Sequence, residues 1–377
     1  MSTGQMAVRG KLAYGLYRVA TLAGAPLIYL HLHWRRLRGL EHPSRWPERF
    51  GRPSLPRPPG PLLWFHAVSL GEGLAAIPVI KHCVGQHPGF VVLMTTTTTS
   101  AFEVIKDRLP NGVIYQLAPV DFPLVVDAFL GYWKPVAVLL MESELWPNLI
   151  ISASEKGITV ALLNARMSSR SLKRWSGPIA LPLISFMLSK LSLIVPLSTV
   201  EAIRFQLLHA SPSIINFAAV GDFDILEKEG MKIKDLQLQL AERPTWMAAS
   251  LHKGEEEGEL RMLYRVTPIA VIGGSFLPGL AGHNLSEAAA AGCAVLTGPY
   301  IGHFSNMLAE MLQSDCLSVL QVGGNIELFE ALEQLLGDVK ALGARQEAAR
   351  RAFSAVSNGV VNRVWNLISH YVLKKTH

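Results

Sequence analysis

Short apolar runs alternate with helical stretches through most of the 377-residue chain, and this alternation constrains the fold more than any other feature. A run that is apolar throughout predicts a strand buried on both faces, as strands are in parallel sheets covered by helices. Such runs occupy residues 61–65, 90–95, 113–117, 136–141, 158–163, 191–195, 217–220, 246–249, 269–273 and 294–296. With helices between them, they predict an α/β fold of doubly wound parallel sheets.

Length and proline content divide the chain. The length predicts two domains, and the 50% hydrophobic content is enough to fill a core in each. Five prolines between residues 53 and 61 predict a stiff linker. We therefore expect an N-terminal helix region over 1–52, a Rossmann-like domain over 53–221 and a second over 222–377. The last helix, predicted over 363–373, is a candidate to pack back on the first domain.

The N-terminal region is predicted to associate with a membrane surface. Residues 12–34 are mostly apolar, but they are interrupted, and a clean membrane span needs about 20 apolar residues. The interruptions are Arg18, Pro26, His31 and His33, and the basic residues in and around the segment are Arg9, Lys11, Arg18, Arg35, Arg36 and Arg38. A helix in the membrane interface beside anionic headgroups fits this pattern best; an ordinary surface helix is the alternative. Because the first acidic residue is Glu41, the start is also typical of a mitochondrial transit segment.

Charge and cysteine content exclude several classes of function. The formal charge of +6 fits anionic ligands or a membrane surface. No basic run is interleaved with aromatic residues, so a nucleic acid is not an expected partner. Cys83, Cys293 and Cys316 lie far apart in the sequence, which indicates a reducing compartment and no metal site.

The run GEGLAA at residues 71–76 matches the dinucleotide-binding pattern G-x-G-x-x-A directly after a predicted strand. That pattern expects an acidic residue at the end of the second strand, where it binds ribose hydroxyls. Here residues 95–99 are all threonine, and the next acid, Glu103, lies in a helix that Ser100 is predicted to cap. We therefore exclude an NAD-type oxidoreductase and expect no cofactor.

Polar side chains follow the predicted strands at four places. In a parallel sheet the carboxyl ends of the strands meet at one edge, and α/β proteins bind their ligands there. The four groups are Ser69, Gly71 and Glu72; Glu142 and Glu144; Asn164 and Arg166 with Ser168, Arg170, Lys173 and Arg174; and Gly273, Gly274, Ser275, Gly282, His283, Asn284 and Glu287. Glycines permit close approach to a phosphate, and a helix N-terminus attracts one. Glu72 is the candidate general base.

Each group also has a structural interpretation. The carboxylates of Glu72, Glu142 and Glu144 can complement helix dipoles, the cations after Arg166 can form a solvated face, and residues 282–284 can form a helix cap. Taken together at strand ends in two domains, the four groups favour a binding site.

At these residues the sequence resembles the 3-deoxy-D-manno-octulosonic acid (Kdo) transferases, which transfer Kdo from CMP-Kdo to a lipid A precursor. The resemblance covers most of the chain. Its blocks are RWPERFG at 45–51, HAVSLGE at 66–72, MESELWPN at 141–148, NAR at 164–166, SLHKGEE at 250–256, GGS at 273–275 and GHNLSE at 282–287. The E-x-E-L-W-P and G-H-N-x-x-E blocks in this order are highly specific.

The resemblance implies a GT-B fold with two Rossmann-like domains facing across a cleft, the first binding the acceptor and the second the donor. It implies an inverting, metal-independent transfer in which Glu72 is the base. The acceptor-binding residues implied are Ser69, Gly71, Arg49, Glu142, Glu144, Asn164 and Arg166. The donor-binding residues implied are Ser250, His252, Gly274, Ser275, Gly282, His283, Asn284 and Glu287. The implied partners are CMP-Kdo, the lipid A precursor and, through the N-terminal helix, a membrane surface.

Positions at which the sequence departs from the family pattern lead to expectations about location and about the donor domain. Ala281, the pair at 285–286 and His303 resemble the plant branch, which implies a mitochondrial, membrane-associated protein; the cytoplasmic face of a bacterial inner membrane is the alternative. Between Glu257 and Leu260 a segment on the order of 50 residues, one to two βαβ units, is missing from the donor domain. The phosphate-binding Pro-Arg-His-Pro type motif is lost with it. A catalytically impaired, membrane-bound form of the enzyme is therefore the alternative function.

Overall fold

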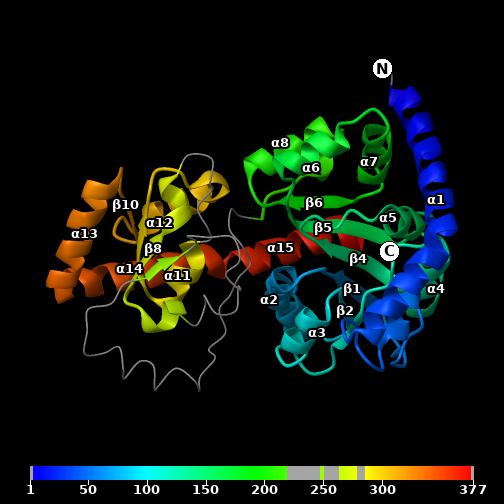
Figure 1. The fold of residues 1–377 in the computed structure, drawn as a ribbon, viewed down its shortest axis with the longest axis horizontal. Helices are drawn as coiled ribbons and strands as arrows, with labels where there is room; N and C mark the ends of the chain where they lie inside the picture. Colours follow the sequence, from blue (N-terminus) through cyan, green and yellow to red (C-terminus); the bar gives the residue numbers. More distant parts are fainter. Residues whose placement is uncertain (1–2, 219–246, 250–262, 278–284, 375–377) are drawn as a thin grey trace. The chain divides into compact units, whose positions relative to one another are not determined.

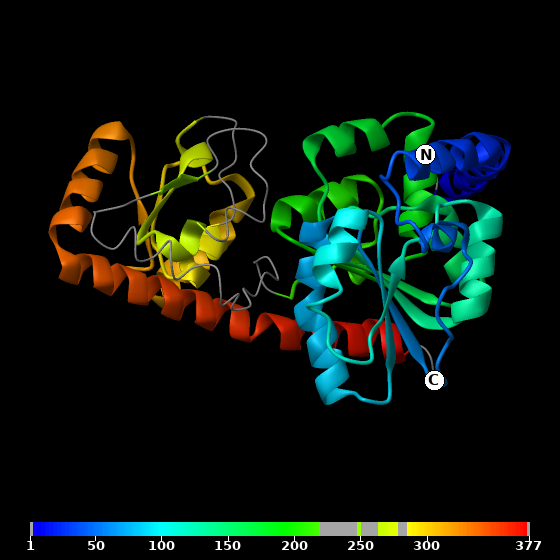
Figure 2. The same ribbon diagram turned by 60° about the horizontal axis from the view of Figure 1, so that its bottom comes forward.

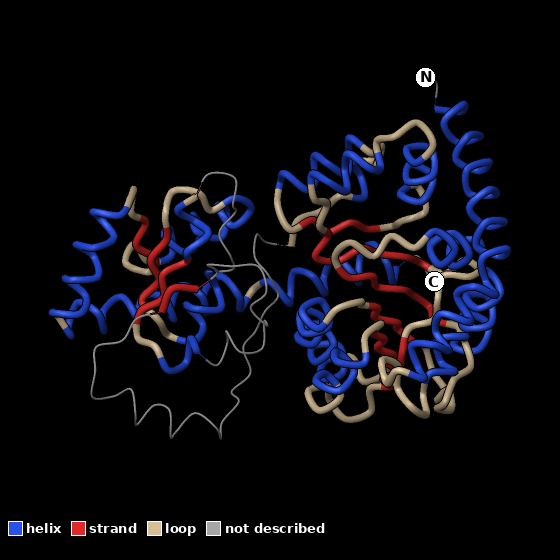
Figure 3. The backbone as a smooth tube through the Cα atoms, viewed as in Figure 1, coloured by secondary structure: helices blue, strands red, loops and turns tan. Residues whose placement is uncertain are grey.

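The computed structural model describes residues 3–218, 247–249, 263–277 and 285–374. The chain forms two compact units (Figure 1). Unit 1 comprises Met1–Ala218 and Val361–His377, and unit 2 comprises Ala219–Val360. Each is an α/β unit around a parallel sheet, so the predicted fold class is confirmed. In Figure 3 the strands of each unit lie between helices.

The sheet of unit 1 has six parallel strands in the order β3-β2-β1-β4-β5-β6. The strands are β1 (Leu62–His66), β2 (Val91–Thr96), β3 (Ile114–Leu117), β4 (Pro135–Met141), β5 (Thr159–Ala165) and β6 (Leu193–Pro196). β1 is buried along its whole length. Successive side chains of a strand point to opposite faces of the sheet. Trp64 packs against Phe129, in a helix on one face, and Leu63 and Phe65 are buried on the opposite face. This double burial is why the strands are apolar throughout.

Helices pack on both faces of this sheet. They are α2 (Leu70–Gln86), α3 (Thr99–Ile105), α4 (Pro123–Trp133), α5 (Pro147–Glu155), α6 (Ser169–Trp175), α7 (Ala180–Leu188), α8 (Thr199–Leu207) and α15 (Val360–Ile368), which continues into a π-helical turn, η5 (Ser369–Leu373). The cap of α3 is Thr98, not Ser100 as predicted, because the Thr98 hydroxyl accepts the Ala101 N–H at 3.3 Å. Residues 217–218, the described part of the strand predicted over 217–220, are not in a strand.

The N-terminal helix α1 (Thr3–Leu37) lies along α7, as Figures 1 and 2 show. Gly10 permits this close approach, since a Cβ there would lie 2.6 Å from Cβ of Phe186. A buried carboxylate fixes the middle of the helix: Asp121 accepts the Tyr17 hydroxyl at 3.0 Å and the backbone N–H groups of Asn148 and Leu149 at 3.1 and 2.8 Å. Within the described part of the chain, every helix is too short or too polar to cross a bilayer.

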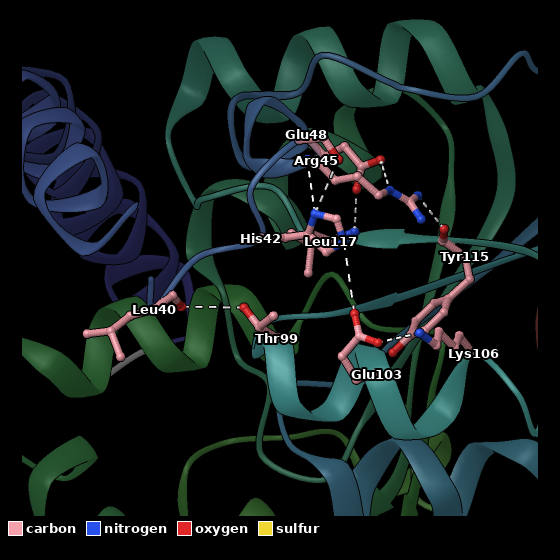
Figure 4. A network of polar contacts seen from close by, with 10 residues as sticks. Leu40, His42, Arg45, Glu48, Thr99, Glu103, Lys106, Tyr115 and Leu117 are labelled. Carbon is pink, nitrogen blue, oxygen red and sulfur yellow. Dashed lines mark hydrogen bonds and ion pairs between the residues drawn. The ribbon is translucent and has the colours of Figure 1, made fainter. Parts of the chain in front are cut away.

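A second buried carboxylate, Glu48, fixes the segment between α1 and β1 (Figure 4). Glu48 lies in the 3₁₀ helix η1 (Trp46–Phe50), is 0% exposed, and accepts the backbone N–H of Leu117 at 2.7 Å and Arg45 Nε at 2.8 Å. The Arg45 guanidinium also donates to the carbonyl of Tyr115 at 2.6 Å. These contacts join the segment to the end of β3, so much of the RWPERFG block has a structural role.

Unit 2 has a four-stranded parallel sheet in the order β10-β9-β8-β7. The strands are β7 (Met247–Ala249), β8 (Ile269–Ile272), β9 (Ala294–Thr297) and β10 (Val319–Gln321); the helices are α11 (Leu285–Ala291), α12 (Ser305–Ser314), α13 (Asn325–Gly337) and α14 (Val339–Asn358). Side chains of α11, α12 and α14 form a core on one face of the sheet, and those of α13 pack on the other. The expected shortening near 257–260 lies outside the described residues.

Two of the carboxylates drawn in Figure 4, one buried and one exposed, predict unequal responses to mutation. Glu48→Ala leaves the Leu117 N–H buried without its acceptor and should lower the free energy of unfolding by about 3 kcal/mol, measured by urea denaturation. The matched control is Glu103→Ala, which removes the pair that an exposed carboxylate makes with Lys106 on the surface of α3. That variant should unfold at nearly the urea concentration of the unmodified protein. Equal effects of the two substitutions would contradict the structural role of Glu48.

Candidate functional site

The chain order in the sheet of unit 1 creates a switch point between β1 and β4. From β1 the chain proceeds outward through β2 and β3, then returns to β4 and proceeds the other way through β5 and β6. The connections that leave the carboxyl ends of β1 and β4 therefore turn to opposite sides and open a crevice between them. The predicted residues Glu72, Glu142 and Glu144 follow these two strands, and Asn164 and Arg166 lie at the end of the neighbouring β5.

Glu72 lies in the first turn of α2, which begins at Leu70. The Ser69 hydroxyl caps the helix by accepting the Glu72 N–H at 3.3 Å. In return the carboxylate of Glu72 accepts the Val68 N–H at 2.7 Å and the Ser69 hydroxyl at 3.1 Å. The helix cap thus orients both oxygens at the carboxyl end of β1. Glu72 can therefore take part in the cap of α2 and also act as a base.

The glycine after Glu72 has a packing role. A Cβ at Gly73 would lie 2.2 Å from Cδ1 of Ile105, so the glycine lets α2 and α3 approach each other. This contact accounts for the second glycine of the dinucleotide-like run without a bound pyrophosphate.

Backbone strain marks the ends of β4 and β5. Glu142 and Asn164 both have φ of 53°, in the left-handed region, which is rare for glutamate. The two turns bind each other: the Glu142 N–H donates to Leu163 O at 2.8 Å, and the Ser143 hydroxyl donates to Arg166 O at 3.0 Å. The guanidinium of Arg166 lies 3.8 Å from the carboxylate of Glu142. The structure therefore brings Glu142, Asn164 and Arg166 together at the ends of β4 and β5.

Glu144 occupies a different environment from Glu72. Its carboxylate accepts a hydrogen bond from the indole N–H of Trp146. Burial, and after it the nearby charge of Glu72, raise the pKa of Glu144 to about 7 against the lowering effect of the indole. The site thus contains two carboxyl groups with unlike environments.

A positively charged loop lies beside these carboxyl groups. The loop from β5 to α6 carries Arg166, and α6 carries Arg170, Lys173 and Arg174. Arg204 of α8 holds the loop by donating to Met167 O at 2.8 Å and to the Ser169 hydroxyl at 3.0 Å. Glu201, buried and bonded to the Ser198 hydroxyl, lies 3.7 Å from the Arg204 guanidinium. Neither Arg204 nor Glu201 was predicted to support this loop, although the S-x-x-E spacing at 198–201 is the sequence signal for the contact between Ser198 and Glu201.

Arg49 lies apart from the loop. It is only 7% exposed, and its guanidinium donates to Ala118 O at 2.8 Å and lies 3.9 Å from the carboxylate of Glu41. These contacts favour a structural role for Arg49 over the acceptor-binding role that the family resemblance implies.

The donor residues expected in unit 2 are described only in part. Ser275 is buried in the 3₁₀ helix η3 (Gly273–Phe276) after β8. Its hydroxyl donates to Ile272 O at 2.5 Å and accepts the Gly298 N–H at 2.6 Å, which joins the ends of β8 and β9. Gly274 precedes it, and Glu287 lies in the first turn of α11. Ser250, His252, Gly282, His283 and Asn284 lie outside the described residues.

Comparison with known proteins identifies relatives along the chain. The family model described as 3-Deoxy-D-manno-octulosonic-acid transferase (kdotransferase) matches residues 44–223. The probable mitochondrial 3-deoxy-D-manno-octulosonic acid transferase of Arabidopsis thaliana is 48% identical over 434 residues, covering 97% of each chain. The 3-deoxy-D-manno-octulosonic acid transferase of Haemophilus influenzae is 25% identical, covering 94% of this chain and 98% of its own.

Solved structures share the fold. A glycosyltransferase from Rickettsia africae superimposes with a TM-score of 0.57 at 13% identity, covering 84% of this chain and 99% of its own. HepE of Anabaena, in complex with UDP, gives a TM-score of 0.56 at 10% identity, covering 82% and 99%. Together with the two parallel sheets, these similarities confirm the predicted GT-B class.

The hydrogen bonds by which Arg204 holds the β5–α6 loop can be tested by hydrogen exchange. Arg204→Ala removes two charge-assisted hydrogen bonds, so the amide protons of residues 167–172 should exchange about tenfold faster, a loss of about 1.4 kcal/mol. Lys173→Ala, on the exposed surface of α6, is the matched control and should leave these rates nearly unchanged. Unaltered exchange in Arg204→Ala would show that the loop is held by other contacts.

Proposed function

The chain belongs to the 3-deoxy-D-manno-octulosonic acid (Kdo) transferase family, and on that premise we propose that it transfers Kdo from CMP-Kdo to a lipid A precursor. The observation that carries this proposal is the pair of carboxyl groups at the switch point, with Glu72 oriented by its helix cap beside a basic loop. The carboxylate of Glu72 can act as the base that takes the proton of the acceptor's sugar hydroxyl. The cations of the loop can bind the phosphates of the lipid acceptor.

The proposed reaction is an inverting displacement. A hydroxyl oxygen of the acceptor attacks the anomeric carbon of Kdo, and the bond from that carbon to the CMP oxygen breaks, its electron pair leaving with CMP. The acceptor proton passes to the carboxylate of Glu72. A carboxylate suffices as the base because the alcohol loses its proton only as the new bond forms.

We assign acceptor binding to the residues around Glu72. Ser69 and Gly71 shape the turn before it, and Glu142, Glu144 and Asn164 form the adjoining strand ends. Arg166 and the cations of α6 are placed to meet the acceptor's phosphates, with Arg204 holding the loop. Arg49 supports this edge from the interior instead.

We assign donor binding to unit 2. Gly274 and Ser275 after β8 and Glu287 in α11 lie at the carboxyl ends of its strands, where nucleotides bind in such sheets. Ser250, His252, Gly282, His283 and Asn284 complete the proposed CMP site by resemblance alone.

We further propose that α1 binds a membrane surface from which the acceptor is taken. Exposed apolar residues recur along one side of the helix at spacings of three, four and eight residues, while Tyr14 and Leu32 on the opposite side are buried. The exposed ones are Val8, Leu12, Leu16, Val19, Leu27, Leu30, Trp34 and Leu37. Arg38 stacks over Trp34 with its charged carbon 4.1 Å from the ring centroid, an arrangement suited to the headgroup level. We also propose a mitochondrial location for this chain, which the mitochondrial relative in Arabidopsis supports.

One observation favours a second candidate, a catalytically impaired form of the enzyme. The 434 positions aligned with the Arabidopsis relative exceed the 377 residues of this chain by 57, so at least 57 positions of the alignment have no counterpart here. If this gap falls between Glu257 and Leu260, the donor site has lost a strand, a helix and a phosphate-binding arginine.

The role of Glu72 is tested by incubating the protein with CMP-Kdo and a tetraacylated lipid A precursor and measuring CMP release. Glu72→Gln keeps the size of the side chain but removes the base, so kcat should fall by a factor of about 100 or more. Calorimetric titration with CMP should give the same affinity for both proteins, since Glu72 lies in unit 1. Absence of both CMP binding and turnover in the unmodified protein supports the impaired form instead.

Membrane binding is tested by flotation with vesicles of phosphatidylcholine and phosphatidylglycerol. The double variant Leu12→Glu/Leu16→Glu places two charges on side chains that are 67% and 63% exposed, and it should lose vesicle binding. Val339→Glu, on the exposed surface of unit 2, is the control and should float like the unmodified protein. If the double variant still floats with the vesicles, α1 is an ordinary surface helix that does not bind the membrane.

A further inference from the structure

Buried polar side chains lie behind the turn that follows β4. His66 is the last residue of β1, Thr95 is its partner in the register of β2, and both are buried. The hydroxyl of Thr95 accepts the indole N–H of Trp64 at 2.9 Å and lies 2.9 Å from Nδ1 of His66. Trp64 in turn packs on Phe129, with ring centroids 4.4 Å apart. These side chains are therefore fixed to the helical layer on one face of the sheet.

The hydrogen bonds of Thr95 assign the orientation and the tautomer of His66. An indole N–H can only donate, so the hydroxyl of Thr95 accepts from Trp64 and has its own proton available for Nδ1 of His66. This arrangement makes Nδ1 the acceptor and assigns the ring proton to Nε2. Burial, and after it the charge of Arg49, lower the pKa of His66 to about 3, in agreement with a neutral ring. The imidazole is therefore held in one orientation.

The ring of His66 meets the turn that carries Glu144. It packs against Trp146 with centroids 5.1 Å apart and planes at 84°, the edge-to-face geometry that aromatic pairs prefer. The indole N–H of Trp146 donates to the carboxylate of Glu144. Consecutive contacts therefore join the core, through His66 and Trp146, to a carboxylate at the end of β4.

We propose that His66 is a positioning residue, which with Thr95 behind it fixes the ring of Trp146 and thereby orients the carboxylate of Glu144 toward the acceptor. The proposal rests on the proposed function, in which Glu144 binds the acceptor. It accounts for a histidine at the end of β1, where Nε2 is buried without a hydrogen-bond partner among the described residues. A phenylalanine would fill the same space without an unpaired polar atom. The imidazole adds the bond to Thr95, which prevents the ring from turning.

The backbone of the turn is fixed by other contacts. Before the turn, β4 pairs with β5 as far as Met141. After it, Asp121 accepts the N–H groups of Asn148 and Leu149 at 3.1 and 2.8 Å. The direction of the Glu144 carboxylate depends instead on its bond to the indole. Loss of the bond behind His66 should therefore disturb this carboxylate and leave the fold of the turn intact.

The support of Trp146 is tested first without substrate, in protein labelled with ¹⁵N at the tryptophan indoles. The Trp146 signal is identified by its loss in Trp146→Phe. Thr95→Val removes the hydroxyl behind His66, and His66→Phe keeps a ring but removes Nδ1. In both variants the Trp146 signal should move toward the position of an indole without an acceptor. Thr95→Ser keeps the hydroxyl and should leave the signal in place.

The matched control is Thr96→Val. The hydroxyl of Thr96 lies 2.7 Å from that of Tyr115, and successive residues of β2 point to opposite faces of the sheet. This variant therefore loses a comparable buried hydrogen bond on the other face, and its Trp146 signal should not move. An unmoved Trp146 signal in Thr95→Val overturns the proposal, and so does an equal movement in Thr96→Val.

The kinetics of CMP release provide the second measurement. Thr95→Val should raise KM for a tetraacylated lipid A precursor about tenfold and leave KM for CMP-Kdo nearly unchanged. The double variant Thr95→Val/Glu144→Gln should have the same KM for the precursor as Glu144→Gln alone, since Thr95 acts through Glu144. Additive effects overturn the positioning role. If the unmodified protein transfers no Kdo but the Trp146 signal moves as stated, the proposed function fails while the support of Trp146 by His66 stands.

Discussion

The parallel pairing of β1 with β4 is the constraint on which the rest of unit 1 depends. Leu63 to His66 lie beside Ala137 to Leu140, so the two strands end at the same level. Since the chain winds outward in opposite directions from this pair, nothing in the sheet crosses its carboxyl ends, and the first residues after each strand are free to form a site. Glu72 and Glu144 therefore follow two strands that end side by side.

Much of this arrangement is predictable from the sequence, because the strands are buried on both faces and are therefore apolar throughout. The double winding and the loops bearing Glu72, Glu142, Asn164 and Arg166 follow from that pattern. The cap of α3 was wrongly predicted because five consecutive threonines offer several equivalent caps, and only the packing of Phe102 and Ile105 against the core selects Thr98. No local pattern distinguishes among them.

The supporting residues were not predictable for a different reason. Arg204 is distant in sequence from Met167 and Ser169, and only the three-dimensional structure brings them together. Arg49 illustrates the opposite error. It belongs to a block shared with the family and has a charge suited to phosphate, yet its guanidinium is enclosed by Ala118 and Glu41. Membership of a shared block did not distinguish a residue that supports the site from one that contacts substrate.

The attachment of α1 has a consequence for proteolytic trimming of the N-terminus. Its basic, acid-free sequence is typical of a leader that a processing protease removes, but its buried side forms part of the folded unit: Gly10 and Tyr14 pack against Phe186, and Tyr17 reaches Asp121. Proteolysis after Tyr17 would expose the apolar surface of α7 and leave Asp121 without its hydroxyl partner. The helix can therefore be trimmed without loss of these contacts only ahead of Gly10, and a protein cut further along would lose stability.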